Sequence, residues 1–332
     1  MATIDMSPYS SIQDALDNNT MDVNGDTFVF PDGWNVTEAG TRLDFTHFNG
    51  GSWGDINAKK STVFLADGDV TVSCPANGFF YMTPAFVHVG MKYINTANGS
   101  LIYDGSADQY STAMINCSVE CPTPNGSAGV YTGRGRSFFN QCYFKNISRT
   151  FRDYGLCIEN CVFDTCSMYN GGSGWSIENC LFINSHAGTY GGSTNQSHMN
   201  RCTFIGGGSN YFSIGYCVPN AGYTCITNCL FKDALWGLHR STSADGGYCS
   251  AFNNYYYNVT NPSNFAGCLI YEDPIELTED PLPTPGVYVP VTTEMGDIIG
   301  FDPSRFTINP YIGPFPSAGG SAIPPSFLQI RV

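Results

Sequence analysis

The chain has 332 residues, a length that allows either two domains or one elongated body. Only 13% of the residues are charged and the formal net charge is −14, so we expect the chain to repel nucleic acid and anionic membrane surfaces. No apolar stretch is long enough to span a membrane, and no basic-then-apolar leader opens the chain, so we expect no membrane insertion and synthesis in a cytoplasm.

The N-terminal region predicts a short helix followed by a strand. Residues 11–14 read Ser-Ile-Gln-Asp, which has the spacing of a capping box. The apolar residues that would share one face of this helix are Ile12, Ala15 and Leu16. Residues 25–31 then alternate as a strand does. We assign residues 1–58 to an N-terminal cap and entry strands.

A six-residue phrase recurs through the middle of the chain: an apolar residue, any residue, a polar residue, Cys, any residue and an aromatic residue. Full copies occupy residues 139–144, 158–163, 177–182, 199–204 and 226–231, and weaker copies occupy residues 114–119 and 251–256. Successive cysteines in these copies lie 19 to 27 residues apart. This is the period of a supersecondary unit that repeats and stacks, so the sequence predicts a solenoid.

The interior of each repeat favours short strands over helices, because its spacers are rich in Gly, Ser and Asn. If Ile158 points inward, alternation with a bend after Asn160 directs the Asn, Cys and Phe of each copy into the core. Glu159 and Val162 then point outward. We expect one stacked aromatic column in the core, made of Phe144, Phe163, Phe182, Phe204 and Phe231.

The phrases Ile-Glu-Asn-Cys-Val-Phe at residues 158–163 and Ile-Glu-Asn-Cys-Leu-Phe at residues 177–182 resemble those of right-handed parallel β-helix proteins of the pectin-lyase-like type. The resemblance implies an all-β, right-handed parallel β-helix solenoid with a short helix that plugs its first coil. We assign residues 59–270 to this solenoid. It implies no single function, because the fold carries polysaccharide lyases, glycosidases, adhesins and the spikes and decorations of tailed bacteriophages.

The fourteen cysteines allow two interpretations. Stacked cysteines could form disulfides in an oxidising compartment, or they could form a ladder of buried thiols, which we favour in the absence of a leader. Two groups could converge on a metal ion, namely Cys157, Cys161 and Cys166, and Cys217, Cys225 and Cys229. No compact Cys-x-x-Cys pair occurs, so we expect no metal and no cofactor.

Two groups of charged residues are candidates for catalysis. In-register stacking would place Glu159 and Glu178 one coil apart, near the carboxylate spacing of retaining glycosidases, although two solvated glutamates would have the same pattern. Asp153 beside Arg149 and Arg152 approximates the acid and base set of pectate-lyase-like enzymes, with a surface ion pair as the alternative. No other enzyme motif occurs.

Other side chains are candidates for ligand binding. Aromatic rings that could stack on sugars, or pack in the core instead, are those of Trp175, Tyr190, Tyr211 and Trp236. His186 and His198 lie in Gly- and Ser-rich spacers, where we expect loop positions without chemistry.

An apolar row is predicted on the outside of the solenoid. It contains Tyr143, Val162, Leu181 and Leu230. Such a row on a polar body is expected to be covered, either by neighbouring copies of the chain or by its own tail. Residues 271–332 form that tail, which holds eleven of the nineteen prolines and many apolar residues, and it predicts an extended arm laid along a surface.

These observations lead to two functional hypotheses. The first is a non-enzymatic structural virion protein of a tailed bacteriophage, a capsid decoration or a spike subunit, assembled in the host cytoplasm. Its expected partners are copies of itself in a homotrimer and other virion proteins, with host surface glycans as a further candidate. The alternative is an extracellular polysaccharide lyase or glycoside hydrolase of the same fold, such as a phage depolymerase.

Overall fold

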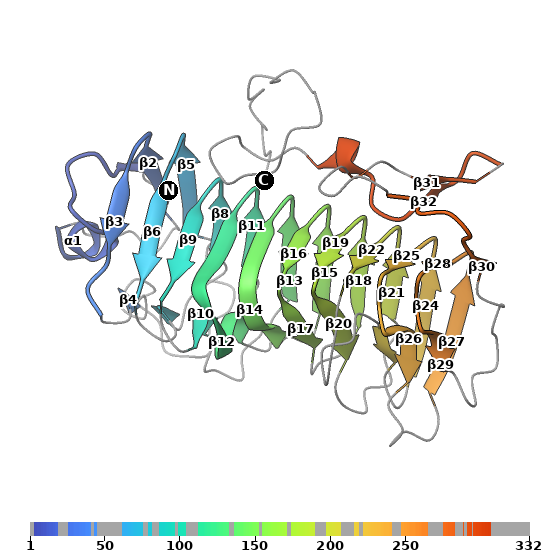
Figure 1. Cartoon of the computed structure of the whole chain (residues 1–332). Helices are drawn as coiled ribbons and strands as arrows, with labels where there is room; N and C mark the ends of the chain where they lie inside the picture. The colour runs from blue at the N-terminus through green and yellow to red at the C-terminus, as the bar shows by residue number, and fades with distance from the viewer. Residues whose placement is uncertain are drawn as a thin grey trace.

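The computed structural model describes most of the chain. Its described residues are 3–18, 26–40, 43–44, 62–75, 79–81, 86–96, 99–103, 112–132, 136–152, 155–170, 174–189, 197–206, 216–218, 222–240, 247–264, 275–282, 288, 291–293 and 295–306. These residues form an elongated all-β parallel β-helix with a short helix at one end and the C-terminal arm along one side (Figure 1). The predicted fold class is thereby confirmed.

Three parallel sheets run along the β-helix. The first contains β1 (Thr3–Asp5), β2 (Thr27–Pro31), β5 (Thr62–Asp67), β8 (Phe86–Val89), β11 (Thr112–Ile115), β13 (Arg136–Asn140), β15 (Gly155–Glu159), β18 (Trp175–Glu178), β21 (Ser197–Asn200), β24 (Gly222–Thr227) and β27 (Gly247–Phe252). The third and shortest contains β17 (Ser167–Asn170), β20 (His186–Thr189), β23 (Tyr216–Val218), β26 (Trp236–Arg240) and β29 (Asn261–Asn264).

The second sheet carries the outer row that contains Val162 and Leu181. Its main path contains β3 (Asn35–Thr37), β6 (Thr71–Cys74), β9 (Lys92–Asn95), β12 (Ser118–Thr132), β14 (Tyr143–Arg152), β16 (Val162–Asp164), β19 (Leu181–Ile183), β22 (Thr203–Ile205), β25 (Leu230–Lys232), β28 (Tyr255–Tyr257) and β30 (Ile275–Glu276). Beside this path lie β4 (Leu43–Asp44), β7 (Phe80–Tyr81) and β10 (Ser100–Tyr103).

The aromatic column in the core is confirmed. Ring centroids of Phe144 and Phe163 lie 5.0 Å apart, and the next three steps along the column measure 4.8, 4.4 and 5.0 Å. Tyr256 extends the stack beyond Phe231 at 5.1 Å. Each of the five Phe side chains is fully buried. The spacing is that of neighbouring strands, so each coil contributes one ring to a continuous stack.

The polar residue of the phrase forms the bend between the first and second sheets. It adopts a left-handed conformation, with φ between 51° and 55°, at Asn116, Gln141, Asn160, Asn179, Arg201, Asn228 and Asn253. Asn is the residue that tolerates this conformation best after Gly, which explains its recurrence. The sequence analysis placed the bend after Asn160, whereas the structure places it at Asn160. The Asn side chains form a ladder along the bend, in which Asn179 donates to Asn160 at 2.9 Å. Asn160 in turn donates at 3.0 Å to Asn140, the residue before the bend in the previous coil.

The cysteine of the phrase satisfies a backbone carbonyl at the same bend. Its thiol donates to the carbonyl two residues earlier, at 3.1 Å for Cys161 and 3.3 Å for Cys180. The core positions predicted for the ladder are confirmed, since all its members are buried: Cys117, Cys142, Cys161, Cys180, Cys202 and Cys229. Burial raises the pKa of the Cys161 and Cys180 thiols well above the ordinary value.

The N-terminal helix α1 (Ile12–Asn18) closes the first coil, as predicted (Figure 1). Ser11 Oγ accepts a hydrogen bond from the Asp14 N–H at 2.9 Å, and the Ile12 N–H donates to Glu38 Oε1 at 2.7 Å. The buried apolar face of the helix joins the main core. The strand β1, which precedes the helix and pairs with β2, was not predicted.

Candidate functional site: the arm-binding face

The outer row predicted from the repeat is in register along the second sheet. Tyr143 pairs with Val162, Val162 with Leu181, Leu181 with Thr203, and Thr203 with Leu230. These side chains point away from the aromatic column, yet they are buried. Val162 and Leu181 are 0% exposed. We call this row, from Tyr143 to Leu230, the arm-binding face.

The C-terminal arm of the same chain covers this face (Figure 1). The arm comprises Leu282, Tyr288, the antiparallel strands β31 (Val291–Thr292) and β32 (Ile298–Ile299), and the 3-10 helix η2 (Pro303–Arg305). Phe301 packs in one cluster with Tyr143, Val162 and Leu181. Leu282 and Ile299 pack in a second cluster with Leu230. The sequence analysis expected either neighbouring copies of the chain or its own tail to cover this row, and in the structure the tail covers it.

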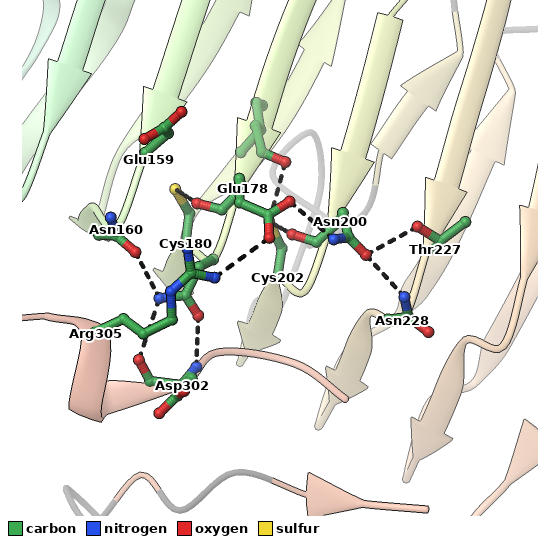
Figure 2. Close-up of polar contacts among 12 residues, drawn as sticks. Glu159, Asn160, Glu178, Cys180, Asn200, Cys202, Thr227, Asn228, Asp302 and Arg305 are labelled. Carbon is green, nitrogen blue, oxygen red and sulfur yellow. Dashed lines mark hydrogen bonds and ion pairs between the residues drawn. The ribbon is translucent and has the colours of Figure 1, made fainter. Parts of the chain in front are cut away.

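Backbone groups of the arm hydrogen-bond to successive coils. The Gly300 N–H donates to the Asn228 carbonyl at 2.7 Å, and the Phe301 N–H donates to Thr203 Oγ1 at 2.8 Å. The Asp302 N–H donates to Asn179 Oδ1 at 2.6 Å, and Asn179 Nδ2 donates back to the Asp302 carbonyl at 3.2 Å (Figure 2).

Close approach at this crossing requires glycine. Gly300 has φ +75°, and a Cβ there would lie 2.4 Å from Thr203 Oγ1 and 3.1 Å from Leu230 Cβ. A side chain at this position would therefore separate the arm from the sheet.

Glu178, one member of the candidate glutamate pair, contacts the arm. Its Oε2 accepts from Asn200 Nδ2 at 2.8 Å, and its Oε1 forms an ion pair with Arg305 Nη1 at 3.4 Å (Figure 2). Glu159 and Glu178 are partners in register on β15 and β18, so the expected stacking one coil apart is present. Glu159 Oε1 accepts from the Cys157 thiol at 3.7 Å. Arg305 thus contacts one of the two carboxylates, and both partners of this ion pair are partly exposed, at 41% for Arg305 and 23% for Glu178.

A buried ammonium group holds the start of the arm. Lys232 Nζ donates to both carboxylate oxygens of Asp280, at 2.5 and 2.6 Å, and to the Leu282 carbonyl at 3.0 Å. Lys232 is only 7% exposed. Desolvation opposes ionisation of Asp280, but hydrogen bonds from Lys232 and the Leu282 N–H lower its pKa overall. This charge pair anchors the arm at the last coils of the β-helix.

Neither of the two candidate tryptophans lies at this face. Trp175 is 4% exposed and packs in the main core, so its ring is not available to stack on a sugar. Trp236 is half-buried on β26. Asp153, Tyr190 and Tyr211 lie outside the described residues.

The two histidines singled out by the sequence differ from each other. His186 begins β20 rather than lying in a loop, and its Nε2 is 2.8 Å from Ser167 Oγ. Burial lowers the pKa of His186 to about 4. His198 is exposed on β21.

Sequence reasoning missed several polar groups. Lys232 follows the aromatic column at a position that carries both charged and apolar residues in earlier coils, namely Lys145, Asp164, Ile183 and Ile205. Nothing in the repeat therefore singled out Lys232. His88 and Tyr93 are buried in an aromatic cluster, with His88 Nδ1 2.6 Å from the Tyr93 hydroxyl. These two residues lie before the regular copies of the phrase, so the repeat gave no signal for them.

No group of three His, Cys, Asp or Glu side chains within the described ranges is placed to hold a metal ion. Across those same ranges, no helix has the length and apolar character of a membrane span.

No family model, curated protein or solved structure matches the chain.

Proposed function

We propose that this chain is a non-enzymatic structural protein, a capsid decoration or spike subunit of a tailed bacteriophage virion. The observation that carries the proposal is that the chain's own C-terminal arm binds the outer face of the β-helix. Its apolar row is covered by the arm, and the charged residue beside it, Glu178, binds Arg305 of that arm. In this proposal the Glu178 carboxylate stabilises the bound arm and does not act on a substrate.

The geometry of the acid pair supports a structural role. A retaining glycosidase needs two carboxylates facing the sugar, one as nucleophile and one as acid. Asn200 Nδ2 donates to one oxygen of Glu178 and the Arg305 side chain, which extends from η2, contacts the other (Figure 2).

The rest of the molecule fits a rigid building block. Stacked rings, thiols and Asn side chains repeat from coil to coil, and the surface carries few charges. In this proposal the partners are other copies of the chain and other virion proteins, and host surface glycans are a candidate ligand.

The alternative, a polysaccharide lyase or glycoside hydrolase of the same fold, draws on the register of Glu159 and Glu178. One experiment separates the two functions. Purified particles are analysed by mass spectrometry for the chain, and recombinant protein is screened for glycan degradation. The screen includes the double variant Glu159→Gln/Glu178→Gln and the control Glu276→Gln, whose carboxylate is exposed on β30. We expect the chain in particles and no degradation by any variant. Degradation that the double variant abolishes and the control retains would establish the enzyme instead.

A further inference from the structure

Strands near the N-terminal end of the first sheet carry apolar residues on both of their faces. On β5, Phe64 is buried in the core while Val63 and Leu65 alternate with it and point outward, and Leu65 is 36% exposed. Parallel strands that are apolar on both faces are typical of sheets that are covered on both faces. We call the outward surface the N-terminal outer face and define it by Val63, Leu65, Val87, Val89, Ile115 and Phe138, all of which are partly or largely exposed.

The apolar character of this surface is confined to one part of the sheet. Leu65 pairs in register with Val89, and Val89 pairs with Ile115. The same row continues into Asn140, Glu159 and Glu178, so it becomes polar from β13 onward. The later coils thus have the polar outer surface expected of a sheet that faces water, and the earlier coils do not.

The second sheet shows what covers an apolar outer row in this protein. Val162 and Leu181 are 0% exposed because the arm packs on them. The two clusters that contain described residues of the arm include none of the side chains of the N-terminal outer face. Within the described part of the chain, the arm therefore covers only one of the two apolar outer surfaces.

The course of the arm leads toward the second of these surfaces (Figure 1). The N–H groups of Gly300, Phe301 and Asp302 bind successive coils, and each coil is one step nearer the N-terminal end. Arg305 then reaches Glu178, which lies on the outer row that continues to Ile115 (Figure 2). The last described residue, Phe306, packs in the cluster that contains Tyr143 and Val162.

The rest of the chain has the composition and the length to continue along this row. Residues 307–332 include five prolines and a single charged side chain, that of Arg331, and most of their large side chains are apolar. From Glu178 to Leu65 the row crosses five coil spacings, which is about 24 Å. An extended proline-rich segment spans this distance with about eight residues at about 3.1 Å each.

We propose that residues 307–332 bind the N-terminal outer face of the same chain and continue the arm from the second sheet onto the first. Apolar side chains of this segment then shield those of Leu65, Val89 and Ile115 from water. The bound residues 299–306 hold the start of the segment close to the face, and this high effective concentration favours the same chain over a second copy. The inference goes beyond the proposed structural function and does not depend on it.

Photo-cross-linking in the full chain tests which segment covers the face. A p-benzoylphenylalanine residue replaces Phe138, which is similar in shape and partly exposed. After irradiation, mass spectrometry should identify peptides from residues 307–332 joined to this position, at the mass of a single chain. The same group in place of His198, which is exposed on the polar part of the sheet, should give no such products.

Truncation after Phe306 provides a second measurement, because it keeps every described contact of the arm. The truncated protein should bind the dye ANS severalfold more strongly than the full chain, since ANS reports exposed apolar surface. A synthetic peptide of residues 307–332 should reverse this increase. Ile115→Asp in the truncated protein should prevent the reversal, whereas Ser176→Asp, on the polar part of the same sheet, should not. The cross-linking experiment needs neither variant, so it stands if Ile115→Asp does not fold.

Two results would overturn the proposal. Cross-links from position 138 at the mass of two chains would show that a second copy covers the face. Absence of residues 307–332 from the cross-linked peptides, together with unchanged ANS binding after truncation, would show that this segment lies elsewhere. Neither result bears on the virion role, which the analysis of purified particles tests separately.

Discussion

Asn179 and Asp302 exchange two hydrogen bonds across 123 positions of the sequence. The Asp302 N–H donates to the Asn179 side-chain oxygen, and the Asn179 amide donates to the Asp302 carbonyl. The same amide also donates to Asn160, so the Asn ladder of the β-helix and the backbone of the arm form one network. Asn179 therefore has two roles, because it adopts the left-handed conformation at the bend and also binds the arm.

Replacement of Asn179 by Gly should release the arm while leaving the bend intact, because Gly accepts the left-handed conformation without strain. Loss of the paired hydrogen bonds should cost about 1–3 kcal/mol of arm docking. Hydrogen exchange at residues 300–302 measures this effect. Gln141→Gly changes the same bend two coils away and should leave exchange in the arm unchanged.

Replacement of Gly300 by Ala should also displace the arm. The new Cβ would overlap Thr203 Oγ1, and the alanine would carry the cost of a left-handed backbone. Gly296→Ala is a matched control, because Gly296 has a similar φ of +83° with no neighbour within 4 Å. Arm protection in hydrogen exchange should fall much more for Gly300→Ala. Equal losses in the two variants would mean that backbone strain, and not the close approach to the sheet, sets the effect.

The aromatic column should dominate the stability of the β-helix. Phe182 is fully buried between Phe163 and Phe204, and Phe182→Ala should lower the free energy of unfolding by about 3–5 kcal/mol. Urea titration measures this change. Phe252→Ala, at a ring that is 40% exposed, should cost much less.

Acid should destabilise the fold through its buried histidines. Burial lowers the pKa of His88 from 6.5 to about 3, and that of His186 to about 4. Between these values and 6.5 the unfolded chain binds protons that the folded chain does not, so stability is complete above pH 6.5 and falls as the pH drops.

The variant His88→Gln, which does not titrate, should flatten this dependence in urea titrations at a series of pH values. His198→Gln is the control, because His198 is exposed. A wild-type slope in the His88 variant would assign the acid sensitivity to other groups.

Thiol reactivity should follow burial. The thiolate is the reactive form, and burial raises the pKa of Cys180 far above the ordinary value, whereas half-buried Cys157 is raised only to about 11. Alkylation of the folded protein at mildly alkaline pH should therefore modify Cys157 before Cys180. Denaturation without reductant should then expose most of the fourteen thiols. Recovery of almost none would indicate disulfides and an oxidising compartment.

The sequence was sufficient to predict what repeats. The position of Phe163 over Phe182, and of Val162 beside Leu181, follows from strand alternation and in-register stacking, because one error in register would reverse every side chain. The bend itself was predicted, but it was placed after Asn160, and the left-handed conformation of Asn160 was not predicted.

The arm path could not be predicted in the same way. Its proline content and apolar residues indicated a surface-bound segment, but no period links Asp302 to Asn179 or Arg305 to Glu178. Such pairings are decided by three-dimensional fit between an aperiodic segment and a repetitive surface. The sequence shows that the arm is apolar and that the β-helix has an apolar outer row, but it does not show which arm residue contacts which coil.

The contacts of residues 300–302 fix the number of coils over which the arm can bind. Three consecutive arm residues bind Asn228, Thr203 and Asn179, which belong to three consecutive coils. A solenoid has no intrinsic limit to its number of units, since each touches only its neighbours. Here, removing or duplicating one of these three coils would leave the ladder intact but put the arm out of step with it. The arm therefore fits only one number of coils beneath it. Insertion or deletion of a whole coil should preserve all contacts of the arm only in the part of the β-helix that the arm does not cross.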